Sequence, residues 1–392
     1  MKLFEERPGS NRRMGGGEMR STIRQTARGN QKFQDLPEPT GEAPYHLSLD
    51  KILSANQIKA ITDSGSISFH AVGDSGGVRS PQAQQIVTIA MEADFVNDND
   101  AGNKNTNPSF FYNLGDVVYF YGEASSYYPQ FYEPYAFYPA PIFAIPGNHD
   151  GDIGRDSTES SLGAFVRNFC SKKIEITPDA GEVSRPAMIQ PNVYWTLEAP
   201  FVTIIGLYSN VPEGGQFDNK QIEWLKEELT NAPKNKALVL AVHHPAFSLD
   251  DHHSGSITIV EALDRAFEDS GRMADVVLNA HVHNFQRFTR QLGDHQIPYI
   301  VAGAGGYPNL HHMQEKHIEV PYRLPDRDDT TLENYCDDRH GYMYLQISSN
   351  TIGGKYYAVS RPQESWRQPP LKIDSFELDI RTHKLTKSAI TL

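Results

Sequence analysis

Residues 67–76 run Ile67-Ser68-Phe69-His70-Ala71-Val72-Gly73-Asp74-Ser75-Gly76. An apolar stretch that ends in a Gly-Asp turn is typical of a buried strand with a polar side chain at its carboxyl end. Four more polar motifs follow apolar runs of this kind: Gly115-Asp116-Val117-Val118-Tyr119, Gly147-Asn148-His149-Asp150, Val242-His243-His244 and His281-Val282-His283. Strand ends of α/β proteins carry the chemistry, so we expect all five motifs along one edge of a sheet.

The spacing of apolar residues predicts an α/β protein. Six strands are expected, most of them directly before a motif: 67–72, 110–114, 141–145, 201–207, 237–242 and 275–278. Helical spacing is found over 47–60, over 221–229 and at Ile259, Leu263 and Phe267. Four later runs read as strands that complete a second sheet: 298–302, 342–347, 355–359 and 376–380. Residues 308–340, rich in His, Asp and Arg, are expected to form a long loop, at the rim of a site or disordered.

Composition narrows the class of protein. The 392 residues carry 49 acidic and 36 basic side chains, a formal charge of −13, which argues against a general nucleic-acid-binding surface. The sequence has no run of 18 apolar residues and no apolar core of a secretory signal, so we expect no transmembrane segment and a cytoplasmic location. Two cysteines, Cys170 and Cys336, are too few for a disulfide framework, although one bridge between them stays open.

The N-terminal part differs from the rest. Residues 1–45 are polar, interrupted by Gly and Pro, and without periodicity, which predicts a flexible extension before one large domain over 46–392. Residues 1–32 contain 8 Lys and Arg against 3 Glu. The extension is therefore either a segment that meets an anionic partner or simply a solvated tail.

The motif side chains suit a site for two metal ions. Such a site needs a carboxylate shared by both cations and further ligands that complete each coordination sphere. Asp116 is the natural bridge between the two ions. The other six side chains divide into two groups, Asp74, Tyr119 and His283 for one ion and Asn148, His243 and His281 for the other. Each motif alone could be an ordinary turn, but five in order after buried strands indicate a metal centre.

The motifs resemble those of the calcineurin-like metallophosphoesterases, and specifically of the purple acid phosphatases. That family has Gly-Asp-x-Gly, Gly-Asp-x-x-Tyr, Gly-Asn-His-Asp/Glu, Val-x-x-His and Gly-His-x-His. The chain departs at Ala280, where the family has Gly, and Val242 directly precedes His243, so the Val-x-x-His spacing is met only from Leu240. The resemblance covers roughly residues 66–310. It implies a four-layer αββα sandwich with two mixed sheets, and the absence of an extra N-terminal β-domain resembles the short, tartrate-resistant type.

The resemblance also assigns histidines that the residues alone leave open. Either His243 or His244 could coordinate a metal, and the family ligand lies two residues before a proline, which selects His243. The family's substrate-contacting histidines then fall on His252 and His253. For this pair an exposed polar loop remains the alternative.

Tyr119 bears on the identity of the metals. A tyrosinate added to two carboxylates and a hydroxide would cancel the residual positive charge of two divalent ions, and a trivalent ion restores it. Tyr119 thus predicts Fe(III) beside Asp74, Asp116 and His283, with a divalent Fe, Zn or Mn in the other position. The alternative is that Tyr119 packs as an aromatic side chain.

The resemblance implies hydrolysis of small phosphorylated substrates, with a metal-bound hydroxide attacking phosphorus. His149 would contact the phosphoryl group or protonate the leaving group, aided by His252 or His253, or it would only orient other groups. Asp150 is a candidate to hold His149 in its working tautomer, or a turn residue. We expect a phosphomonoesterase; the alternatives are a phosphodiesterase for cyclic nucleotides or lipid headgroups and a non-catalytic binding module.

Two further segments have open interpretations. An aromatic-rich stretch could stack on an aryl or nucleotide leaving group or pack against the sheet: Tyr127, Tyr128, Phe131, Tyr132 and Tyr135. The glycine-rich stretch 303–306 lacks a following Gly-Lys-Ser/Thr, so a nucleotide loop is not supported. We expect a tight turn that lets backbone approach the metal centre.

Overall fold

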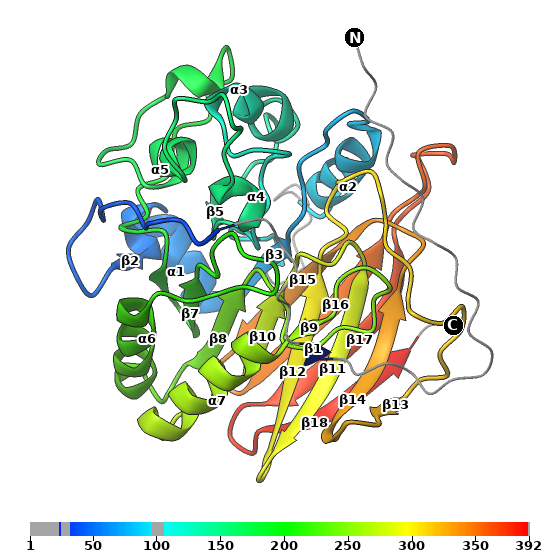
Figure 1. Cartoon of the computed structure of the whole chain (residues 1–392). Helices are drawn as coiled ribbons and strands as arrows, with labels where there is room; N and C mark the ends of the chain where they lie inside the picture. The colour runs from blue at the N-terminus through cyan, green and yellow to red at the C-terminus, as the bar shows by residue number, and fades with distance from the viewer. Residues whose placement is uncertain (1–22, 25–31, 96–105, 391–392) are drawn as a thin grey trace.

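Two large β-sheets pack face to face and carry helices on their outer sides (Figure 1). The computed structural model describes residues 23–24, 32–95 and 106–390. One sheet has nine strands in the order β13-β14-β11-β12-β10-β8-β7-β6-β2, and the other has seven in the order β18-β17-β16-β15-β3-β4-β5. Both mix parallel and antiparallel pairs, which confirms the predicted class of two mixed sheets in an α/β sandwich.

The strands that lead into the motifs lie at one edge of the seven-stranded sheet and in the middle of the nine-stranded sheet. In the seven-stranded sheet, parallel neighbours are β3 (Ser66–Val72), β4 (Phe111–Asn113) and β5 (Ile142–Ala144). In the nine-stranded sheet they are β7 (Val202–Leu207), β8 (Ala237–Val242), β10 (Val276–Asn279) and β12 (His295–Ala302). Strands β7, β8 and β10 are buried along their whole length, as expected for parallel strands covered on both faces. Their continuous apolar runs come from this double cover, and all six predicted strands are confirmed.

The remaining strands are mostly antiparallel. They complete the nine-stranded sheet with β2 (His46–Ser48), β6 (Trp195–Ala199), β11 (Phe285–Leu292), β13 (Tyr322–Leu324) and β14 (Arg327–Cys336). They complete the seven-stranded sheet with β15 (Gly341–Ser348), β16 (Thr351–Ala358), β17 (Leu371–Asp379) and β18 (Lys384–Ile390). A two-residue pair joins β1 (Ile23–Arg24) to β9 (Gly255–Ser256).

Two expectations for the second half of the chain are wrong. The strand predicted over 298–302 lies beside β10 in the nine-stranded sheet, not in the second sheet, because a hairpin through β11 returns the chain there. Residues 308–340 are not one long loop, since their second half forms β13 and β14. Strand β14 alternates buried and half-exposed positions, and its inward residues include Thr330 and Asn334, so the hydrophobic pattern is weak.

The helices cover the outer faces. In Figure 1, α6 (Asn219–Asn231) and α7 (Ile257–Ser270) lie side by side against the nine-stranded sheet. Against the other sheet lie α2 (Gln82–Ala93), α3 (Ala124–Tyr127), a π-helical turn η2 (Tyr128–Tyr132) and α5 (Gly163–Phe169). Shorter elements are η1 (Leu49–Lys51), α1 (Ala55–Ser64), α4 (Asn148–Gly151) and η3 (Pro178–Ala180).

The helix predicted around Ile259, Leu263 and Phe267 is confirmed as α7, with all three side chains buried. The hydroxyl of Ser256 accepts from the Ile259 N–H at its start, and Gly271 ends it in the left-handed conformation. The helix expected over 221–229 is α6. The one expected over 47–60 is shorter, because residues 46–51 form β2 and η1 instead.

The described part of the expected N-terminal extension packs on the domain. Gln34 and Asn210 exchange two hydrogen bonds of 2.9 Å, and the Trp224 indole donates to the Pro44 carbonyl at 2.7 Å. Residues 34–45 are therefore held by the nine-stranded side before β2 begins. Most of the basic stretch, 1–22 and 25–31, lies outside the described residues.

Three open points of the sequence are settled by burial. Within the described chain Cys170 and Cys336 are both buried and free, so they do not pair. The aromatic stretch packs in the core, since four of its five rings are almost fully buried: Tyr127, Phe131, Tyr132 and Tyr135. In the part of the chain described, no helix is long and apolar enough to span a membrane.

Candidate metal centre

The motif residues come together from two sheets rather than one. Asp74, Asp116 and Asn148 follow β3, β4 and β5 of one sheet, while His243 and His281 follow β8 and β10 of the other. The expectation that all five motifs lie along the edge of a single sheet is therefore wrong. The site lies where the carboxyl ends of strands from both sheets meet. Asp74, Asp116 and His281 have φ values of 52°, 52° and 66°, so the backbone turns sharply just where each side chain is presented.

One group of donors contains Asp74, Tyr119 and His283. The Tyr119 hydroxyl donates to Oδ1 of Asp74 at 2.8 Å and lies 3.3 Å from Nε2 of His283. The same His283 nitrogen lies 3.4 Å from Oδ1 of Asp74. The other ring nitrogen of His283 contacts the Asn309 carbonyl at 3.1 Å, which leaves Nε2 directed at the group. The three residues assigned to one ion therefore do meet.

The second group contains Asp116, Asn148, His243 and His281. Nε2 of His243 lies 3.4 Å from Oδ2 of Asp116, and Nδ1 of His281 lies 3.0 Å from Oδ1 of Asn148. Nδ1 of His243 is turned away, toward the Leu114 carbonyl at 2.9 Å. Ligand atoms of Asp116, His243 and His281 all lie within 4.8 Å of one another, close enough to hold a metal ion.

The distances between these donor atoms suit ligands that share a cation. Two ligands that are each about 2.0–2.2 Å from one ion are roughly 3.0–3.4 Å apart, and all the spacings above fall in that range except the 2.8 Å contact of Tyr119 with Asp74. Among the described residues, the buried Nε2 of His243 has no hydrogen-bond partner, which is costly unless a ligand supplies one. Carboxylate, amide, imidazole and phenol groups are a donor set suited to hard and borderline metal ions.

The charged groups in the site shift one another's pKa values. Burial opposes ionisation of Asp116, but the His243 and His149 imidazoles hold the pKa of its carboxyl well below the usual range. Burial also opposes the charged form of His243, yet the Asp116 carboxylate raises its pKa to about 9. Burial and the nearby His253 lower the pKa of His281 to about 4, so this imidazole is neutral at pH 7.

Asp116 links the two groups. Burial raises the pKa of Tyr119 well above 10, and the carboxylates of Asp116 and Asp74 raise it further. Asp116 thus acts on Tyr119 in the first group while it contacts His243 in the second. Its Oδ1 also accepts the backbone N–H of His149 at 2.9 Å.

His149 lines a pocket of about 920 Å³ beside the two groups. Its Nδ1 contacts the Phe120 carbonyl at 2.8 Å. Of the two roles left open for Asp150, the structure shows that of a turn residue, because its carboxylate accepts backbone N–H groups of Val117, Val118 and Gly147 and not the His149 ring. Burial, with Asp116 nearby, raises the pKa of Asp150 to about 7.

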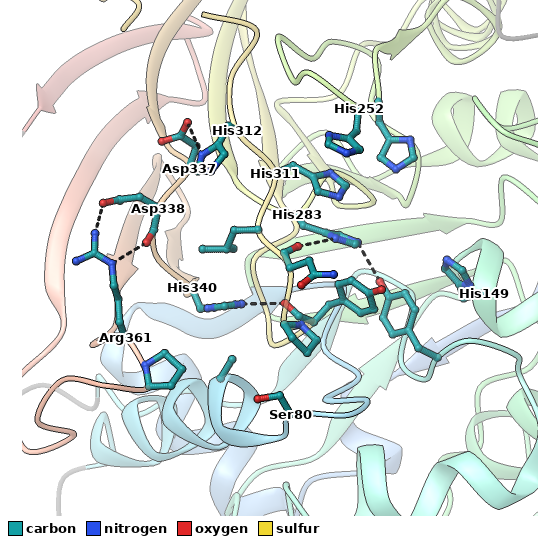
Figure 2. A pocket seen from close by; sticks show the side chains of 18 of the residues that line it. Ser80, His149, His252, His283, His311, His312, Asp337, Asp338, His340 and Arg361 are labelled. Atoms are coloured by element: carbon teal, nitrogen blue, oxygen red, sulfur yellow. Dashed lines mark hydrogen bonds and ion pairs between the residues drawn. The ribbon is translucent and has the colours of Figure 1, made fainter. Parts of the chain in front are cut away.

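The other predicted histidines line the same pocket. His252 is mostly exposed, and its Nδ1 lies 2.6 Å from Oδ1 of Asp251. His253 is more enclosed, and its Nδ1 lies 2.9 Å from Oε1 of Glu213. His244, expected to pack or hydrogen-bond nearby, contacts the Ser209 hydroxyl through Nδ1 at 2.7 Å. In Figure 2, His149 and Arg361 lie on opposite sides of the pocket.

One wall of the pocket is a continuous series of stacked or tilted rings. Successive ring centroids are 4.3–4.6 Å apart in the order His252, His311, His283, Tyr307, Tyr119 and His149. His311 and Tyr307 were not predicted. Both lie in the segment after β12 that sequence reasoning treated as a glycine turn and a loop.

The glycine turn is confirmed as a close approach to the site. A Cβ at Gly303 would lie 2.1 Å from the Val282 carbonyl oxygen and 2.7 Å from Oδ2 of Asp74. Any side chain there would displace the Val282 carbonyl or the Asp74 carboxylate.

Glu213 is a further site residue that sequence reasoning missed. It follows β7, the one predicted strand to which no motif was attached. A signal was present in the sequence. The polar residue Ser209 closely follows the strand, and Glu213 stands directly before Gly214-Gly215.

Together, the two mixed sheets and the metal-type donors where their strand ends meet define an α/β protein with a candidate metal centre. Residues 67–285, more than half of the chain, match the family model for calcineurin-like phosphoesterases, and the chain belongs to that family. No curated protein matches the chain.

Solved structures share the fold at low sequence identity. The purple acid phosphatase isolated from yellow lupin (Lupinus luteus) seeds has a TM-score of 0.55 and 15% identity, over 80% of this chain and 54% of that one. GAP50, described as the anchor in the inner membrane complex of Plasmodium, has a TM-score of 0.51 and 14% identity, over 83% of this chain and 90% of that one. PhoD has a TM-score of 0.52 and 12% identity, over 84% of this chain and 72% of that one. The chain spans about half the length of the lupin phosphatase.

Proposed function

We propose that the protein hydrolyses phosphate monoesters at a pair of metal ions, in the manner of a purple acid phosphatase of the short, tartrate-resistant type. The observation that carries the proposal is the position of Tyr119, whose hydroxyl lies within 3.3 Å of both Asp74 and His283. Its alternative role, aromatic packing alone, does not account for a buried hydroxyl directed at a carboxylate.

The donor groups support different ions at the two positions. Asp74, Tyr119 and His283, with Asp116 shared, would hold Fe(III), because only a strongly charged ion lowers the pKa of so buried a phenol enough to ionise it. Asn148, His243 and His281, with Asp116, would hold a divalent Fe, Zn or Mn. When bound, such a pair polarises a phosphoryl group and lowers the pKa of water.

The surrounding residues would bind and orient a small phosphorylated substrate. The His149 ring sits against Tyr119 with its Nδ1 held by the Phe120 carbonyl, so its Nε2 is free to meet a phosphoryl oxygen. His253, whose Nδ1 is held by Glu213, can hold a proton on the opposite nitrogen for the leaving group. His252 lies further out and is more exposed, which suits contact with the leaving group rather than with phosphorus.

Parallel assays with p-nitrophenyl phosphate and bis-p-nitrophenyl phosphate test the proposal, using protein reconstituted with Fe and Zn. We expect faster hydrolysis of the monoester and a visible tyrosinate-to-iron absorption band. Preference for the diester would instead establish the phosphodiesterase alternative. Two bound ions without hydrolysis of either ester would favour a binding module.

A further inference from the structure

The loop after β7 lies directly beside the second donor group. Leu207 at the end of β7 is paired in register with Val242 at the end of β8, so residues 208–216 emerge next to His243. Hydrogen bonds within the loop and to the segment before α7 help to hold it there. The Gln216 N–H donates to the Ser209 carbonyl at 2.8 Å, and the Ser256 hydroxyl donates to the Gly214 carbonyl.

From this loop Glu213 reaches two histidines with one oxygen. Its Oε1 lies 2.9 Å from Nδ1 of His253 and 3.5 Å from Nε2 of His281. The two imidazole rings are 4.4 Å apart, and on its other side the His281 ring packs 4.3 Å from His244. His281 is therefore fixed on both faces and has a carboxylate at its Nε2 end.

The opposite nitrogen of His281 belongs to the donor group. Its Nδ1 lies 3.0 Å from Oδ1 of Asn148, the other side chain assigned to the same ion. A neutral imidazole has one N–H and one lone pair, so only one of its nitrogens can accept a cation. Without an ion, Nδ1 can donate to that amide oxygen, whereas Nε2 has no hydrogen-bond partner among the described residues. Once an ion takes the lone pair of Nδ1, the proton must lie on Nε2, which faces Glu213.

The same reasoning excludes a further cation among Glu213, His253 and His281. Their ligand atoms lie within 4.8 Å of one another, as a metal site would require. His281 would then have to give a lone pair from Nε2 as well as from Nδ1, which the neutral ring cannot do.

We propose that Glu213 is a positioning residue that fixes the Nε2-protonated tautomer of His281, and with it the affinity of the second metal ion, while it holds His253 at the pocket wall. The inference rests on the proposed two-ion function. A carboxylate that accepts the outer N–H of a metal-binding histidine typically changes metal affinity by about 10- to 100-fold.

The chain offers a matched control. Glu228 is also a buried carboxylate that contacts an imidazole, with Oε2 2.7 Å from Nε2 of His46, but it lies on α6 away from the donor groups. Glu228→Gln removes a comparable Glu–His pair without touching the candidate metal centre. A general loss of stability would therefore affect both variants. A loss of metal affinity that is specific to the site would affect only Glu213→Gln.

The first measurement uses the wild-type protein loaded with Zn²⁺ and labelled with ¹⁵N. Long-range ¹H–¹⁵N spectra of the histidine rings report which nitrogen carries the proton. We expect His281 to be protonated on Nε2; protonation on Nδ1 overturns the proposal, whether or not any variant folds and whether or not the protein hydrolyses esters.

The second measurement is a calorimetric titration of metal-free protein with Zn²⁺. We expect Glu213→Gln to weaken one of two ions by about 10- to 100-fold and to leave the other unchanged, with neither affected in Glu228→Gln. Unchanged affinity for both ions, or equal loss of both, contradicts the proposal. Three ions in the wild type and two in the variant would make Glu213 a ligand instead. Failure of the proposed function is read separately, as absent ester hydrolysis by wild-type protein with two ions bound.

Discussion

The hydroxyl of Tyr119 donates a 2.8 Å hydrogen bond to Oδ1 of Asp74, although 45 residues separate the two along the chain. The contact joins the turn after β3 to the turn after β4. It places a phenol inside a group of metal-type donors, and it makes Tyr119 the residue that distinguishes an iron centre from one with two divalent ions.

Tyr119→Phe should abolish the visible absorption band of iron-loaded protein while divalent ions still bind. The variant loses the phenolate and leaves Asp74 with one donor fewer, which should cost the metal-free protein about 1 kcal/mol. A visible spectrum and a denaturant titration measure both effects. Tyr112→Phe is the control, since Tyr112 is a buried tyrosine of β4 that faces the core between the sheets. An unchanged band in Tyr119→Phe would remove Tyr119 from the centre.

The stability of the metal-free protein should fall as the pH rises from 7 to 9. The Asp116 carboxylate raises the pKa of His243 from 6.5 to about 9 in the folded protein. A histidine whose pKa is raised by folding stabilises the folded protein. This stabilisation is complete at pH values below the unfolded pKa of 6.5, and it is lost as the pH rises through the folded pKa of about 9. The loss between pH 7 and pH 9 should be about 2 kcal/mol. Urea unfolding at pH 7 and pH 9 measures it, and His243→Gln should flatten the dependence.

The same proton should compete with metal ions. A cation that binds Nε2 of His243 must displace its proton, so affinity for the second ion should rise with pH up to about 9. Zn²⁺ titrations at pH 6 and 7 should differ by roughly tenfold for one released proton. Equal affinities at the two values would show that His243 is not a ligand.

His149→Ala should lower turnover by at least about 100-fold and spare the metal content. The ring lines the pocket beside Tyr119, but no donor group needs it. Steady-state kinetics with elemental analysis on the same sample check this. His312→Ala is the comparison, because His312 lines the pocket yet is 71% exposed. Unchanged turnover in His149→Ala would exclude a direct role.

Gly147→Ala should weaken binding of the second ion. A Cβ at Gly147 would lie 2.1 Å from Oδ1 and 2.4 Å from the backbone nitrogen of Asp116, so the carboxylate that faces His243 must shift. Overpacking of this kind costs about 1–3 kcal/mol. Gly353→Ala is a suitable control, since its nearest neighbour would be the Gln346 oxygen at 3.6 Å. Wild-type affinity and stability in Gly147→Ala would contradict the account of the Asp116 carboxylate.

Much of the centre was predictable because each donor directly follows an apolar strand. Strand β8 was predicted with its true bounds, and the seven donors meet as two groups. Local periodicity carries this information, since a strand covered on both faces must be apolar throughout. The polar residue that ends such a strand is visible without any knowledge of the rest of the fold.

The sequence by itself thus determined the six strands around the motifs and the candidate donors and, through the family resemblance, the class of two mixed sheets. Only the tertiary structure decided that the donors come from two sheet edges, that Asp150 serves backbone N–H groups, and that Glu213 contacts His281. These facts depend on contacts between segments tens of residues apart along the chain. Such contacts are fixed by how the two sheets pack, and a pattern of side chains along one segment carries no record of the segment it will meet.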